Sequence, residues 1–237
     1  MKLSFVIPAY NEEKYIGDCL SSLLKEIKKR SYEIEVIVVN NASTDKTAAI
    51  AQTFSGVKVV DEPKKGLTIA RQKGLREAKG ELLAYIDADT WMPSEWFPKM
   101  EKIMFNDKNV VSYSGPYRYY DAPKYDKIIL ELLWKIFAPL GYWLSGYTVL
   151  GGNFVARKEA LFSMGGFDTS IKFFGEDTDI AKRLSKFGKV KFDMDFFIYA
   201  SSRRFLKDGI LKVSWIYAIN FIWQVLFGRP YTKEYED

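Results

Sequence analysis

Apolar runs alternate with helical patterns from residue 3 to residue 86. The runs 3–7, 34–39 and 82–86 are apolar on both faces, which is typical of buried strands in a parallel sheet. Between the first two runs, apolar residues recur at the spacing of an amphipathic helix that Asn11 can cap. The short connections favour right-handed crossovers, so the pattern predicts an α/β fold with a mostly parallel sheet.

The same reading extends over the rest of the chain. We expect strands at 57–60, 110–113 and 196–199, the last at a sheet edge, and helices at 12–27, 67–78, 93–104 and 210–227. Another helix is expected after Thr44 or Asp45 as its cap.

Composition removes several classes of function. The 237 residues include no His, which excludes Ser-His-Asp and Cys-His catalysis and most zinc sites. A general base must then be a carboxylate, Lys, Tyr or Cys. The one Cys, Cys19, lies in a helical apolar pattern typical of core packing and excludes an intrachain disulfide. The net charge of +5 favours an anionic partner, but the basic residues are dispersed, so we expect no nucleic-acid binding.

Candidate chemistry gathers where the strands end. Asp87 and Asp89 follow the run 82–86, at the sheet edge where open α/β proteins bind ligands. Two such carboxylates repel each other unless a cation lies nearby, and a divalent metal with a nucleotide diphosphate supplies one. A solvated acidic turn is the alternative.

The loops after the first two strands face the same edge. They carry neither a Gly-x-Gly-x-x-Gly motif nor a Walker loop. They offer instead the ring of Tyr10 and the amides of Asn40 and Asn41, which suit a stacked and hydrogen-bonded base.

Four motifs together resemble the successive motifs of family 2 glycosyltransferases, in the same order and spacing, and the resemblance extends to about residue 205. These are VIPAYNE at 6–12, VNNASTD at 39–45, ARQKG at 70–74 and DAD at 87–89. The resemblance implies a GT-A (Rossmann-like) fold and a nucleotide-sugar donor. It implies that Asp87 contacts ribose and that Asp89 binds Mg²⁺ or Mn²⁺ on the diphosphate. The implied nucleotide-sugar contacts are Pro8, Tyr10, Glu12, Asn41, Arg71, Asp87 and Ala88.

One motif departs from the family's pattern. Many members have Asp-Asp where this chain has Asn40-Asn41, and an amide adds a donor and lacks the charge. The identity of the base is therefore left open.

Later motifs supply the acceptor side and the catalytic group. The resemblance makes Asp177 the general base of an inverting, single in-line displacement, with Glu176 binding the acceptor or orienting the loop. Without the resemblance, two acidic residues at the start of a helix indicate only a stabilising interaction with the helix dipole. Gly151, Gly152 and Asn153 would line the acceptor side, or form a simple turn.

Two arginines follow the last expected strand. Arg203 and Arg204 can clamp a diphosphate, because guanidinium matches phosphate geometry, or can form a solvated basic turn. The Gln-x-x-Arg-Trp motif of processive members is absent, which argues against a processive polymerase.

Two apolar segments, 128–150 and 210–227, favour contact with a membrane or a partner. The first contains Pro139 and several glycines, so we do not expect it to span a bilayer. The second is uncharged over 213–228, is rich in Trp and is flanked by basic residues, which favours peripheral membrane attachment over an oligomer interface.

These observations predict a domain organisation and a place of action. A glycosyltransferase domain covers 1–205, divided into a nucleotide-sugar half at 1–115 and an acceptor and catalytic half at 116–205. An apolar helical extension follows at 206–237. No signal peptide is evident, so we expect a cytoplasmic enzyme at the inner membrane face, acting on a glycan or lipid-linked acceptor of the cell envelope.

Two rival functions stay open at this point. A sugar-nucleotide pyrophosphorylase has a related sheet but needs a Gly-rich basic loop after the first strand, where this chain has Pro8, Ala9 and Tyr10. A degenerate binding protein of the same family would keep Asp89 and lack Asp177, and both are present.

Overall fold

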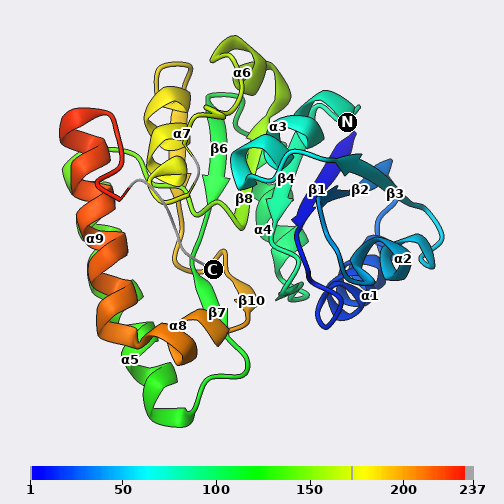
Figure 1. The fold of residues 1–237 in the computed structure, drawn as a ribbon. Helices are drawn as coiled ribbons and strands as arrows, with labels where there is room; N and C mark the ends of the chain where they lie inside the picture. The colour runs from blue at the N-terminus through cyan, green and yellow to red at the C-terminus, as the bar shows by residue number, and fades with distance from the viewer. Residues whose placement is uncertain (1, 172, 233–237) are drawn as a thin grey trace.

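A seven-stranded sheet runs through the molecule in the computed structural model, which describes residues 2–171 and 173–232 (Figure 1). Its strand order is β3-β2-β1-β4-β8-β6-β9. β8 runs antiparallel to both its neighbours, and the other strands of this sheet share one direction. The strands are β1 (Leu3–Ala9), β2 (Ile34–Asn41), β3 (Val57–Glu62), β4 (Leu82–Ile86), β6 (Val110–Ser114), β8 (Asn153–Arg157) and β9 (Lys189–Phe192).

Helices cover both faces of this sheet. They are α1 (Ile16–Ile27), α2 (Thr47–Gln52), α3 (Leu67–Glu77), α4 (Trp96–Met104), α6 (Lys158–Ser163) and α7 (Glu176–Leu184), whereas α5 (Lys124–Ser145), α8 (Arg203–Asp208) and α9 (Ile210–Phe227) lie at one side (Figure 1). Successive strand residues point to opposite faces, so each strand contributes to two cores. Phe5 packs with residues of α1 and α4, whereas Val6 packs with residues of α3 and α7. The mostly parallel sheet flanked by helices confirms the expected fold class.

A second, three-stranded sheet joins distant parts of the chain. It pairs β5 (Thr90–Trp91), β10 (Ile198–Ala200) and β7 (Tyr117–Tyr119), with β10 in the middle. The backbone N–H of Ser201 also donates to the carbonyl of Asp89 at 3.2 Å. This sheet therefore brings the start of α8 against the end of β4.

The two apolar segments form α5 and α9, which lie together at one side of the molecule, away from α1 and α2 (Figure 1). α5 continues through Pro139 and has only Leu130 and Ala138 buried. α9 has the expected bounds and turns Asn220 and Gln224 inward, while Trp215 and other apolar residues are exposed. Both helices are long and apolar enough to cross a membrane by length and composition.

Some expected details differ in the structure. Asn11 does not cap α1, which begins at Ile16, because the Asn11 side chain accepts from the N–H of Thr44 instead. The helix expected from residue 93 begins at Trp96. The strand at 198–200 is central in the small sheet and not at an edge. Of the expected extension at 206–237, residues 233–237 lie outside the described residues.

Candidate active site

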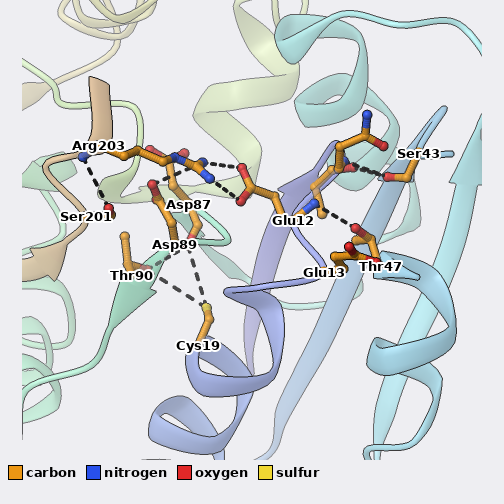
Figure 2. A network of polar contacts seen from close by, with 12 residues as sticks. Glu12, Glu13, Cys19, Ser43, Thr47, Asp87, Asp89, Thr90, Ser201 and Arg203 are labelled. Carbon is orange, nitrogen blue, oxygen red and sulfur yellow. Dashed lines mark hydrogen bonds and ion pairs between the residues drawn. The ribbon is translucent and has the colours of Figure 1, made fainter. Parts of the chain in front are cut away.

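Hydrogen bonds join the loop after β1 to the loop after β2. The N–H of Asn11 donates to Ser43 Oγ at 3.1 Å, and that of Glu12 donates to Thr47 Oγ1 at 2.7 Å (Figure 2). Asn11 has φ of 54°, a left-handed conformation that Asn tolerates better than most residues. These bonds fix the backbone of Glu12, so its side chain is directed toward the end of β4.

The Asn41 amide is committed to the backbone of a neighbouring loop. Its two N–H groups donate to the carbonyls of Glu62 and Lys64, at 3.1 and 2.7 Å, and its Oδ1 accepts from the N–H of Gly66 at 2.8 Å. Asn41 is buried, so it holds the loop between β3 and α3 in place. The neighbouring Asn40 donates to Asp61, and among the described residues its buried Oδ1 has no hydrogen-bond partner.

A buried arginine near the end of β4 lies close to three carboxylates. Arg71, on α3, is 2% exposed and lies 3.2 Å from Asp177 Oδ1, 3.7 Å from Glu176 Oε1 and 3.9 Å from Asp87 Oδ1. Tyr117 donates its hydroxyl to the second oxygen of Asp87 at 2.5 Å. Burial raises the pKa of both Glu176 and Asp177, and the positive charge of Arg71 opposes that rise. α3, β4, β7 and α7 thus meet at one cluster.

Two glycines leave room for this cluster. A Cβ atom at Gly151 would clash with the Asp177 carboxylate and the Arg71 guanidinium. One at Gly152 would clash with the Tyr117 hydroxyl and the Asp87 carboxylate. The turn before β8 therefore approaches these groups more closely than any residue with a side chain allows.

A second arginine lies at the outer end of β4. Arg203 Nη1 donates to Glu12 Oε2 at 2.8 Å, and Nη2 donates to Glu12 Oε1 and lies 3.2 Å from Asp89 Oδ2 (Figure 2). The guanidinium also lies over the Tyr15 ring, 4.6 Å from its centre. Burial raises the pKa of Asp89 to about 7 against the opposing charge of Arg203, and Asp87 and Glu12 raise it further. Asp89 is thus a buried carboxylate that needs a cation.

A sequence model of one family matches most of this chain. The model, described as glycosyl transferase family 2, matches residues 4–164. The chain belongs to this family. The matched region contains Glu12, Arg71, Asp89 and both glycines of the turn, whereas Asp177 and Arg203 lie beyond it.

Relatives of this family 2 chain include named glycosyltransferases. A probable glycosyltransferase of Bacillus subtilis, YdaM, is 28% identical over 201 residues, covering 79% of this chain and 47% of the relative. The dolichol-phosphate mannosyltransferase of Pyrococcus furiosus is 35% identical over 114 residues, covering 46% and 32%. The chain therefore spans less than half the length of these curated relatives.

Solved structures share the GT-A fold with this chain. The mannosyltransferase PcManGT of Pyrobaculum calidifontis, in complex with GDP-Man and Mn²⁺, superposes with a TM-score of 0.62 at 21% identity, over 84% of this chain and 56% of that one. Staphylococcus aureus TarS in complex with UDP-GlcNAc gives 0.64 at 23% identity, over 86% and 59%. These likenesses confirm the expected GT-A architecture.

The surroundings of Asp89 fit a divalent cation. A carboxylate oxygen is the ligand type that Mg²⁺ and Mn²⁺ prefer, and here a guanidinium already stands against it as a cation. Within residues 2–171 and 173–232, no three His, Cys, Asp or Glu side chains are grouped to hold an ion by themselves. The other ligands of an ion at Asp89 would therefore be diphosphate oxygens and water.

The remaining predicted residues are divided between the site and the core. Asn153 is fully buried, and its amide bonds the Trp96 indole and two backbone carbonyls, so it supports the turn from within. Ala88 is also buried. Arg204 donates to the Tyr217 hydroxyl on α9 and lies over the Phe173 ring. Pro8 pairs with β2, and the ring of Tyr10 lies beneath the Lys65 ammonium, 4.0 Å from it.

Two features of the site were not predicted. Tyr117 stood out in the sequence only as part of an aromatic cluster, and no local pattern marks it as the donor to Asp87. The pairing of Arg203 with Glu12 joins residues 191 positions apart, so no local pattern in the sequence indicates it.

Proposed function

We propose that this chain transfers a sugar, with inversion, from a nucleotide-diphosphate donor to an acceptor hydroxyl or a polyprenyl phosphate. The observation that carries the proposal is the meeting of Asp87 and Asp177 around Arg71, beside a turn of two glycines. A donor-side carboxylate and a candidate base thus share one small volume at the ligand-binding edge of the sheet.

The donor would lie along the ends of β1, β2 and β4. Tyr10 and the loop held by Asn41 would border the base, and Asp87 would contact the ribose. Asp89 would hold a divalent ion, which when bound neutralises charge on the departing diphosphate. Arg203, which faces Asp89, would supply further positive charge to the same group, whereas Arg204 is bonded to Tyr217 on α9.

The acceptor would approach Asp177 from the side of the glycine turn. A carboxylate oxygen of Asp177 takes the proton of the acceptor hydroxyl, while the hydroxyl oxygen attacks the anomeric carbon. The sugar–phosphate bond breaks on the opposite face, so one in-line displacement inverts the configuration. Arg71 supports this role, because its charge opposes the rise in the pKa of Asp177 that burial causes and so favours the carboxylate form.

Asp177 also separates the two proposed classes of acceptor. A hydroxyl must lose its proton during transfer, whereas a phosphate monoester, with a second pKa near 6, is already largely ionised at neutral pH. Loss of the base should therefore abolish transfer to a hydroxyl and weaken transfer to a polyprenyl phosphate much less.

Calorimetry of nucleotide binding tests the donor site. UDP, GDP, dTDP and CDP are titrated with Mn²⁺ or Mg²⁺ and again with EDTA. Tight binding of one nucleotide that requires the metal would support the proposal and identify the base. No binding of any nucleotide to folded protein would instead favour a degenerate binding protein, with Asn40 and Asn41 as the first residues to examine.

We also propose that α5 and α9 contact the inner face of the cytoplasmic membrane. The polar Asn220 and Gln224 are buried against the protein, whereas Trp143, Trp215 and Leu226 are each at least 67% exposed. A helix that faces water has the opposite arrangement of polar and apolar side chains. Lys207 and Lys212 flank the apolar face and suit anionic headgroups. A pocket of about 370 Å³ lies at the junction of α5, α8 and α9. Its lining combines the apolar Phe205, Leu206, Ile210 and Leu211 with Gly209 and the charged Asp126 and Lys212, so it suits an acceptor with a lipid tail and a polar head.

Cosedimentation with vesicles of anionic phospholipid tests this contact. Replacing both Trp143 and Trp215 with Ser should release the protein from the vesicles, because each indole is largely exposed on the proposed face. Phe162→Ser, at an exposed aromatic residue of α6, is the matched control and should stay bound. Unchanged sedimentation of the double variant, or a dimer that dissociates on substitution, would contradict membrane contact.

A further inference from the structure

Arg203 is the cation that faces Asp89 in this structure. Its guanidinium forms two parallel bonds with the Glu12 carboxylate and one longer contact, of 3.2 Å, with Asp89 Oδ2 (Figure 2). The Asp89 side chain is 15% exposed, so its charge requires compensation, and Arg203 supplies it. A divalent ion at Asp89 would place a second cation beside this contact.

We propose that Arg203 and a divalent ion exchange at Asp89, with Glu12 retaining the displaced arginine. The inference rests on the proposed function, because it takes Asp89 to be the metal ligand. A guanidinium has donors only, so it cannot share an ion's oxygen ligand without bringing two cations together. Asp89 has two oxygens, but the repulsion between two cations on one carboxylate favours the loss of one when the other binds.

The contacts of Arg203 indicate which bonds persist. Its bidentate pair with Glu12 is the stronger attachment, whereas the Asp89 contact is single and longer. The side chain is 41% exposed, so it can turn from Asp89 without opening the core. Because Glu12 is fixed through its own backbone bond to Thr47, the displaced guanidinium stays beside the donor site.

This exchange makes ion binding and diphosphate binding depend on each other. An ion alone must displace Arg203 and leave the guanidinium with one carboxylate partner. A diphosphate offers the displaced guanidinium a new anionic partner, so it should strengthen ion binding, and the ion should strengthen diphosphate binding equally. Arg203 is thus the residue that prevents the site from filling with metal before the donor arrives.

Titration of Mn²⁺ followed by electron paramagnetic resonance tests the exchange with no turnover involved. Arg203→Ala should bind Mn²⁺ alone on the order of tenfold more tightly than wild type, because the competing cation is gone. Lys207→Ala, which loses the same charge from the exposed face of the same helix, is the matched control and should change the affinity less than about twofold. Arg203→Lys should fall between the two, because an ammonium keeps the charge but lacks the fork.

The outcomes separate the inference from the proposed function. Equal Mn²⁺ affinity in Arg203→Ala and Lys207→Ala, with both folded by circular dichroism, would overturn the exchange alone. Mn²⁺ binding that survives Asp89→Asn would remove the metal role of Asp89, and both ideas with it. Mn²⁺ affinity that rises in Arg203→Ala and is lost on adding Asp89→Asn would support both.

Discussion

Two arginines hold carboxylates at the same edge of the sheet, and they differ in burial. Arg71 is 2% exposed and lies within 3.9 Å of three carboxylates, whereas Arg203 is 41% exposed and contacts two. A buried ion pair leaves an uncompensated charge when one partner is removed, but an exposed pair is replaced by water at small cost. Arg71 therefore belongs to the fixed structure, and Arg203 can move during function.

Different elements of the fold position the two arginines. Arg71 comes from α3, which packs against β1 and β2 of the main sheet, and Asp177 reaches it from α7, whose buried residues belong to the same core. Arg203 is placed by the small sheet, in which β10 pairs with β5 directly after Asp89. The side of the site that holds the proposed base is thus built into the core, and the proposed diphosphate side is assembled by a peripheral sheet.

Replacing the base should produce the largest effect on turnover. Asp177→Asn removes the proton acceptor, so transfer to a hydroxyl should fall by about 10²–10⁴-fold while donor affinity stays near wild type. Asp179→Asn is the matched control, because Asp179 lies on the same helix and pairs with Arg183. Steady-state kinetics with calorimetry separates the two effects, and lost donor binding in Asp177→Asn would exclude the base role.

Removing each arginine should lower the free energy of unfolding by different amounts, more for Arg71 than for Arg203. Arg71→Met leaves three carboxylates without their shared cation and should lower the free energy of unfolding by about 2 kcal/mol, since these partners are partly solvated. Arg203→Ala should lower it by about 1 kcal/mol, because water replaces the exposed guanidinium while the Glu12 and Asp89 carboxylates stay mostly buried. Urea unfolding at pH 7.5 measures both, and equal losses would show that burial does not distinguish the two arginines.

Much of the buried half could be predicted because its signals are local. A strand apolar on both faces, followed by Asp87 and Asp89, specifies both its place in the sheet and the edge at which its carboxylates lie. Turn glycines are also read locally, and the structure shows what Gly151 and Gly152 accommodate. The family resemblance added the role of Asp177, which an acidic helix start alone does not specify.

Other features of the site and of the fold could not be predicted, because they depend on contacts between segments far apart in the sequence. The pairing of β10 with β5 depends on short strands without a strong periodic pattern. Asn153 was expected at the acceptor side, yet its amide satisfies buried partners that come from three other segments. In α9, the polar stripe was visible in the sequence, but its burial depends on α7 and α5, against which the helix packs.

Filling the glycine turn should affect donor binding without unfolding the protein. Gly152→Ala places a methyl group against the Tyr117 hydroxyl and the Asp87 carboxylate, so both must shift, and donor affinity should fall about tenfold. Gly17→Ala is the control, because a Cβ there meets only Ile50 at an ordinary 3.7 Å. Calorimetric titration with the nucleotide that wild type binds measures both; unchanged affinity in Gly152→Ala would remove Asp87 from the donor site.

The smallest effect should appear in the pH dependence of stability, and it concerns the buried cluster alone. Burial, with Asp177 nearby, raises the pKa of Glu176 from 4.5 to about 7 in the folded protein. The folded state then binds this proton more tightly than the unfolded state, so stability should be lost as pH rises through that window. Glu176→Gln stays neutral at every pH, so its Tm relative to wild type should increase by about 3 °C from pH 4.5 to pH 8. The exposed Glu159→Gln should show no such trend, and a parallel trend in both variants would place the responsible carboxyl group outside the cluster.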